Sequence, residues 1–230
     1  MTSTKPRWTE IAPGVHTRTT APADHNVVLV VGTEAAALVN CGAGPQQGAQ
    51  LRAEVGEVTD RPLRWVLLTD GAAHHAGGLP AFDDLTTIGH ESLADADPGA
   101  DAPAPNTTFA AARSINLGEQ WLEAIHLGPA RTSADVAIAV PAAGVVLAGD
   151  LVSGEVDVEP QITAEQQGWP DAVHLLVGML RRDDQVLPGT GGLIGAGEVN
   201  HFGATIDRLL HESAHPEPAA EDERPRLPLV

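Results

Sequence analysis

Short apolar runs bounded by turn residues recur along most of the chain. Their enrichment in valine, leucine and isoleucine, between glycine, proline, asparagine and aspartate, is typical of β-strands. These runs predict short strands at 26–31, 36–40, 63–69, 135–140, 145–148 and 185–187. The first part of the chain is therefore expected to consist mainly of β-hairpins.

Helical patterns lie between some of these strands and become more frequent towards the end of the chain. They predict helices at 46–58, 169–182 and 198–212. In the second of these, Pro170 suits a first helical position, and Val173, Leu176 and Leu180 fall on one face. The mixture predicts an α/β class in which two sheets pack on each other and helices cover their outer faces.

The length of 230 residues is enough for one domain whose core needs no disulfide or metal. We expect a single domain at 1–213, followed by a mobile tail at 214–230 that is acidic and rich in proline and lacks apolar periodicity. Residues 94–106 have the composition of an exposed loop. Cys41 is the only cysteine, which excludes an internal disulfide.

The chain is strongly acidic, with 13 lysines and arginines against 31 aspartates and glutamates, a formal net charge of -18. Nucleic acids and anionic membranes bind basic surfaces, so neither is expected as a partner. No apolar stretch approaches the roughly 18 residues of a membrane span. Residues 1–10 carry no apolar core of a signal peptide. We therefore expect an acidic cytoplasmic protein.

Polar residues gather where four of the apolar strands end. Asp70, His74 and His75 follow the strand in LRWVLLTDGAAHHAGGLPAF. Arg131 lies in HLGPARTSAD, and Asp150 ends the strand in VVLAGDLV. The fourth segment is the glycine-rich turn of VLPGTGGLIG. A rigid sheet can present several such loops to one shared cleft, so we expect a small-molecule pocket there.

The same segments, in this order, resemble the metallo-β-lactamase superfamily, whose members include glyoxalase II, lactonases, thioesterases and arylsulfatases. VGTEAAALVNCGAG is similar to the early hairpin that usually ends in Val-Asp-Thr-Gly, and VLLTDGAAHHAGGLPAF to the Thr-His-x-His-x-Asp-His-x-Gly-Gly signature. ARTSADVAIAVPAAGVVLAGDLV and VLPGTGG resemble the two later segments. The resemblance covers about residues 8–212 and implies a four-layer αββα sandwich.

The metal ligands that the resemblance implies are mostly changed here. Of seven expected positions, His75 and Asp150 keep the family's residue. The other five positions, four for histidine and one for aspartate, carry Asp70, Ala72, His74, Arg131 and Thr190. The chain is thus identified as a diverged member with most metal-ligand positions replaced.

These replacements argue against the family's ordinary dinuclear zinc site. Ala72 has no donor atom, and Arg131 brings a permanent positive charge that repels a cation. In the favoured interpretation the pocket holds no cofactor, and Arg131 takes the place of a metal charge by pairing with Asp70 or Asp150. The resemblance then implies a hydrolase-like protein with a degenerate metal site.

Three functions stay open at this stage. The first is a metal-independent hydrolase, cyclase or lyase step in secondary metabolism, with a small-molecule pocket lined by Asp70, His74, His75, Arg131 and Asp150. One of the two histidines would act as general acid or base, an aspartate would orient it, and the arginine would hold an anionic or carbonyl group. The second is a non-catalytic pseudoenzyme that acts through a protein partner.

The third hypothesis is a mononuclear enzyme whose zinc, iron or manganese ion is held by His74, His75 and Asp150. The chain has ten histidines in all, but the others, His25 among them, are scattered without metal-ligand spacing. No ligand is expected among those others.

Overall fold

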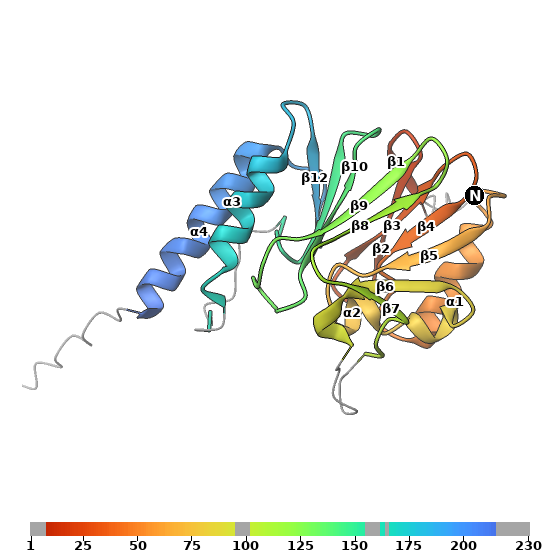
Figure 1. The fold of residues 1–230 in the computed structure, drawn as a ribbon, viewed down its shortest axis with the longest axis horizontal. Coiled ribbons are helices and arrows are strands. Elements are labelled where there is room, and N and C mark those ends of the chain that lie inside the picture. Colours follow the sequence, from red (N-terminus) through yellow and green to blue (C-terminus); the bar gives the residue numbers. More distant parts are fainter. Residues whose placement is uncertain (1–7, 95–101, 155–161, 164–165, 215–230) are drawn as a thin grey trace, which may run out of the picture.

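Two β-sheets face each other, and helices cover their outer sides (Figure 1). The structure is a computed structural model that describes residues 8–94, 102–154, 162–163 and 166–214. The predicted tail beyond Ala214 and the centre of the predicted loop at 94–106 lie outside the described residues. The four-layer αββα sandwich expected from the sequence is confirmed.

Within the described part of the chain, the first sheet has seven strands in sequence order. They are β1 Thr9–Ala12, β2 Val15–Thr20, β3 His25–Val31, β4 Ala36–Val39, β5 Leu63–Leu67, β6 Thr86–His90 and β7 Thr107–Phe109. The strands from β1 to β4 pair antiparallel, and those from β4 to β7 pair parallel. The carboxyl ends of β4, β5 and β6 therefore meet at one edge of the sheet.

The second sheet has the order β12-β11-β10-β9-β8 among the described residues. Its strands are β8 Ala112–Asn116, β9 Trp121–His126, β10 Val136–Val140, β11 Val145–Gly149 and β12 Gln185–Pro188. All neighbours are antiparallel except β11 and β12, which run parallel. The carboxyl ends of these two strands thus also lie together.

Helices flank both sheets. Their bounds are α1 Pro45–Val55, α2 Ala73–Ala76, α3 Trp169–Met179 and α4 Ala196–Ala214, with 3-10 helices η1 Leu79–Phe82 and η2 Glu91–Leu93. Leu51 and Val55 of α1 pack on the first sheet. Val173 of α3 and Phe202 of α4 pack on the second. None of the helices in these ranges combines the length and the apolar character needed to cross a bilayer.

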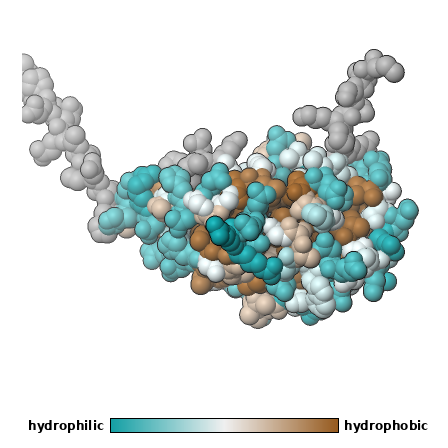
Figure 2. Space-filling model, turned by 90° about the horizontal axis from the view of Figure 1, so that it is seen from above, coloured by the Kyte–Doolittle hydropathy of each residue, from teal (hydrophilic) through white to brown (hydrophobic). Residues whose placement is uncertain are grey.

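Alternation along the central strands explains the four layers. In β3, Val28 and Val30 face the core between the sheets, whereas Val27 and Leu29 face the helix side. β11 repeats this pattern, because its side chains also divide between the two cores. Successive side chains of a strand point to opposite faces, so a strand that is apolar throughout needs cover on both sides. On the outer surface, hydrophilic and hydrophobic residues are interspersed on the face seen in Figure 2.

The strands and helices predicted from apolar patterns are all present, with small shifts at their ends. For example, the strand predicted at 63–69 ends at Leu67, and the helix predicted at 46–58 ends at Val55. The sequence analysis missed β1, β2, β6, β7, β8 and β9. β1, β7 and β8 are edge strands. β2 and β8 consist mostly of polar residues, so these two strands lack a continuous apolar run.

Gly149, the last residue of β11, lets the two sheets approach each other closely. Its φ is +53°, and a Cβ there would lie 2.4 Å from Oγ1 of Thr69, just beyond β5. The backbone also joins the sheets here, since the Val136 N–H donates to the Thr69 carbonyl at 2.7 Å. The ends of β5 and β11 therefore lie together.

We expect Gly149→Ala to destabilise the protein by about 1–3 kcal/mol, because alanine is strained at positive φ and its methyl group would press on Thr69. Urea unfolding measures the change. Gly192→Ala is the matched control, since a Cβ there meets no atom within 4 Å. Equal stability of the two variants would contradict the close packing of the sheets at this point.

Asp135 organises the connection between β9 and β10. Its carboxylate accepts hydrogen bonds from the backbone N–H of Thr132 and, at 2.9 Å, from the Thr132 hydroxyl. Its carbonyl accepts a hydrogen bond from Nδ1 of His126 at 2.9 Å. These bonds hold the turn that carries Arg131. Burial raises the pKa of the Asp135 carboxyl to about 7.

Folding should therefore favour the protonated form of Asp135. Stability from this group is fully present below about pH 4, the usual pKa of aspartate, and is lost as the pH rises through about 7. Asparagine stays neutral, so Asp135→Asn does not lose this contribution. The unfolding free energy of the variant minus that of the wild type should therefore rise as the pH is raised from about 4 to about 7. Urea unfolding at several pH values tests this, and a pH-independent difference would contradict it.

Candidate metal centre

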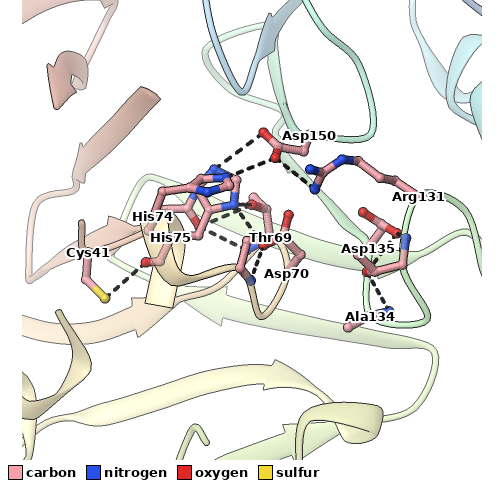
Figure 3. A network of polar contacts seen from close by, with 12 residues as sticks. Cys41, Thr69, Asp70, His74, His75, Arg131, Ala134, Asp135 and Asp150 are labelled. Carbon is pink, nitrogen blue, oxygen red and sulfur yellow. Dashed lines mark hydrogen bonds and ion pairs between the residues drawn. The ribbon is translucent and has the colours of Figure 1, made fainter. Parts of the chain in front are cut away.

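Three histidines and one aspartate converge where the two sheets meet. They are His25, His74, His75 and Asp150, and one potential ligand atom from each lies within 4.8 Å of the others. His25 begins β3, the two adjacent histidines lie in α2, and Asp150 directly follows β11. Both sheets thus contribute to one cluster, as Figure 3 shows for His74, His75 and Asp150.

His75 has the geometry of a metal ligand whose ring is oriented by a carboxylate at the nitrogen that faces away from the cluster. Its side chain is fully buried, and Nδ1 lies 2.9 Å from Oδ1 of Asp70 and 3.3 Å from Oγ1 of Thr69. Within the described residues, Nε2 has no hydrogen-bond partner, and it lies 3.6 Å from Oδ1 of Asp150. A carboxylate that accepts from one ring nitrogen leaves the lone pair of the other for a metal.

Asp70 is fully buried beneath His75 and accepts a hydrogen bond from the Ala72 N–H at 2.8 Å. Burial alone would raise the pKa of Asp70, but the charge and hydrogen bond of His75 bring it below the usual value. For His75 the balance is reversed, since burial would lower its pKa but Asp70 raises it. The sequence placed Asp70 in the pocket lining, with Asp70 or Asp150 expected to orient a histidine, and in the structure Asp70 lies against Nδ1 of His75.

Asp150 links the cluster to Arg131. Its Oδ2 lies 3.0 Å from Nε2 of His74 and 3.0 Å from a terminal guanidinium nitrogen of Arg131. Burial would raise the pKa of Asp150, but the His74 hydrogen bond and the charges of His75 and Arg131 hold it well below the usual range. Asp150 is therefore an ionised carboxylate, and the predicted ion pair with Arg131 is present.

His25 was wrongly excluded by the sequence analysis. Its ring stacks on that of His74, with centroids 3.8 Å apart and planes at 13°, and lies edge-on to His75 at 5.8 Å. Burial and the neighbouring His74 lower the pKa of His25, which favours the neutral imidazole that a metal requires. Its Nδ1 is buried and has no hydrogen-bond partner among the described residues.

The backbone explains how His25 comes to the cluster. It forms an antiparallel bridge with Thr190, the position where the resemblance implies the last metal-binding histidine. The next residue, Asn26, donates from its side chain to the carbonyls of Pro188 and Gly191, both at 2.9 Å. An imidazole from β3 thus lies beside the turn that carries Thr190. A contact 165 residues apart leaves no local spacing in the sequence, which is why it was missed.

Cys41 supports the loop rather than serving as a ligand. Its buried thiol donates to the carbonyl of His75 at 3.1 Å, and burial raises its pKa to about 12. Next to it, Asn40 accepts hydrogen bonds at 3.1 Å from both the N–H and the hydroxyl of Thr69. These contacts fix the chain on either side of Asp70.

The four donors of the cluster fit one cation. Three imidazoles and a carboxylate are a common set for a divalent transition metal. At the other family position, Ala72 has no donor, Asp70 is engaged by His75, and Arg131 is cationic. The loss of the dinuclear site stays a prediction, because the cluster retains three imidazoles and a carboxylate. The cluster supports the mononuclear hypothesis better than the metal-free one and adds His25 to its candidate ligands.

Comparisons with known proteins agree with this fold. The family profile described as the metallo-beta-lactamase superfamily matches residues 20–187. A search of curated proteins finds no match.

Solved structures of low sequence identity share the fold. A metallo-beta-lactamase from Pontibacter korlensis has a TM-score of 0.75 and 20% identity, over 89% of this chain and 98% of its own. The metallo-beta-lactamase FIM-1 from Pseudomonas aeruginosa, in a mono-zinc form, has a TM-score of 0.76 and 20% identity, over 91% and 96%.

A third structure, a metallo-beta-lactamase from Erythrobacter litoralis with beta-mercaptoethanol in its active site, gives a TM-score of 0.71 and 16% identity, over 86% and 95%. At these identities the likeness shows the fold alone. The family profile covers well over half of the chain. The order of the strands, and the polar residues that follow them, agree with this family. The chain therefore belongs to the metallo-β-lactamase superfamily.

Proposed function

We propose that this protein is a mononuclear metal-dependent hydrolase that acts on a carbonyl group of a small molecule. Its metal ion would be held by His25, His74, His75 and Asp150. The observation that carries the proposal is the convergence of these four donors, with a buried ring nitrogen of His75 that lacks a hydrogen-bond partner among the described residues. Zinc suits this donor set, and iron and manganese also accept it.

The comparisons add support of a weaker kind. FIM-1, which shares the fold, is described in a mono-zinc form, so one ion is compatible with this fold. When bound, such a cation supplies Lewis-acid chemistry, because it polarises a carbonyl group and lowers the pKa of water. The chain itself contributes the orientation of the ligands. Asp70 aims His75, and Asp150 keeps its negative charge through its contacts with His74 and Arg131.

A metal-independent step is the second candidate. The ion pair of Arg131 with Asp150 and the hydrogen bond of Asp150 with His74 give an oriented imidazole next to a fixed cation. Such a pair can move a proton while the guanidinium holds an anionic or carbonyl group. In this case His74 would be the general acid or base. The pseudoenzyme hypothesis and the assignment to secondary metabolism stay predictions.

Metal content separates the two candidates. Protein purified without chelators, loaded with excess zinc and desalted, should retain about one equivalent by elemental analysis. We expect His25→Ala to weaken zinc binding, because it removes one imidazole from the cluster. His75→Ala should abolish zinc binding, because it removes the buried imidazole that Asp70 orients.

The matched control is His174→Ala, which changes an exposed histidine on α3 and should retain zinc as the wild type does. Circular dichroism confirms that each variant is folded. Failure of the folded wild type to retain zinc, iron or manganese would contradict the mononuclear hydrolase and favour the metal-independent step. Equal retention by His25→Ala and the control would remove His25 from the ligand set.

The partner behind His75 offers a second test. Asparagine in place of Asp70 keeps the shape and an acceptor oxygen for the ring N–H but removes the charge. We expect Asp70→Asn to lower zinc affinity by about 10- to 100-fold, as is typical when an outer partner of a metal-bound histidine is changed. Competition with a chromogenic chelator measures the affinity. An unchanged affinity would show that Asp70 does not act on the metal through His75.

A further inference from the structure

Arg131 lies next to the cluster and is partly exposed to solvent. One terminal guanidinium nitrogen lies 3.0 Å from Oδ2 of Asp150, and 37% of the Arg131 side chain is exposed, against 12% for Asp150. Figure 3 shows the guanidinium reaching Asp150 from the side opposite to His74. The side chain is therefore both attached to the centre and accessible from solvent.

Within the described ranges, most of the hydrogen-bonding capacity of Arg131 is unused. A guanidinium has five N–H donors in a planar fork. Among the described residues, the polar contacts of this side chain are confined to one terminal nitrogen and Asp150. A fork with unused donors matches the two oxygens of a planar carboxylate.

The position of Arg131 is fixed before any ligand arrives. Its carbonyl accepts a hydrogen bond from the Gln166 side chain at 3.1 Å, and the following turn is held by Thr132 and Asp135. Asp150 restrains the other end of the side chain. A preorganised cation loses little entropy on binding an anion, which favours a specific role in recognition.

The charges of the centre favour a ligand with one negative charge. A divalent cation together with Arg131 carries one positive charge more than Asp70 and Asp150 neutralise. Burial raises the pKa of nearby Asp135, so this group contributes little further negative charge below about pH 7. A monoanionic carboxylate would balance the centre, whereas a dianion would leave an excess of negative charge in a partly buried site.

We propose that Arg131 binds a carboxylate group of the substrate and thereby selects small carbonyl compounds that carry one such group. The inference rests on the proposed function, because Arg131 contacts Asp150, one of the residues that would hold the metal. Arg131 replaces the charge of the missing second cation and adds a directional fork for the carboxylate. It is thus a specificity-determining residue.

Two thiols that differ in one group provide the test. 3-Mercaptopropionate and 3-mercapto-1-propanol both bind cobalt(II) through sulfur, and only the first carries a carboxylate. Cobalt-loaded protein is titrated with each, and the thiolate-to-cobalt absorption band gives the dissociation constants. We expect the wild type to bind the carboxylate thiol about 10- to 100-fold more tightly, as for hydrogen bonds between charged groups.

Arg131→Gln should abolish this preference, that is, lower the affinity for 3-mercaptopropionate much more than that for 3-mercapto-1-propanol. The cobalt content of the variant measures whether the metal centre is retained. Arg131→Lys should retain part of the preference, because it keeps the charge but loses the fork. The control Arg182→Gln, at an exposed arginine beyond α3, should behave as the wild type does.

Three outcomes would overturn the proposal. A preference that survives in Arg131→Gln would mean that the carboxylate binds elsewhere, for instance to the cobalt. A parallel loss of affinity for both thiols would make Arg131 a residue that only positions Asp150. These two results leave the metal centre standing, whereas absence of cobalt binding by the wild type would overturn the proposed function and this inference with it.

Discussion

The buried pair of Asp70 and His75 is the interaction on which the candidate centre depends. Both side chains are inaccessible to solvent, and a carboxylate in such a place is costly unless it is paired and hydrogen-bonded. His75 supplies that pairing, and in return Asp70 decides which ring nitrogen faces the cluster. Thr69, anchored on Asn40, holds the chain immediately before Asp70. The orientation of the His75 nitrogen that faces the cluster is thus set by residues that directly follow a strand, rather than by a mobile loop.

The second constraint is the meeting of the two sheets. α2 brings His74 and His75 from the first sheet, whereas Asp150 belongs to the second. Their distances therefore depend on how closely the sheets approach, which the missing side chain of Gly149 permits opposite Thr69. The apolar core between the sheets makes this approach rigid. A cluster built from both layers can then hold its ligands in place without a long, ordered loop.

Sequence patterns predicted the parts of the fold and site that depend on local signals. Central strands such as β3 and β11 are apolar on both faces and were found, whereas β8, which exposes most of its side chains at a sheet edge, was not. His74, His75 and Asp150 were found because they follow such strands. His25 could not be found in this way, because its place in the cluster follows from pairing with a turn more than 160 residues away.

The changes at the family's ligand positions are physically linked to one another. An arginine beside two divalent cations would be repelled, so Arg131 favours a centre with a single cation, as does Ala72, which has no donor atom. In the proposed mononuclear centre, three imidazoles would hold that cation together with Asp150. Because His25 and Thr190 are bridge partners, with side chains about 5 Å apart in such pairs, an imidazole from either strand can reach the same place. Under the proposed function, His25 on β3 would therefore supply the imidazole that the resemblance implies at Thr190, and under the further inference Arg131 would make the other position a place for an anion.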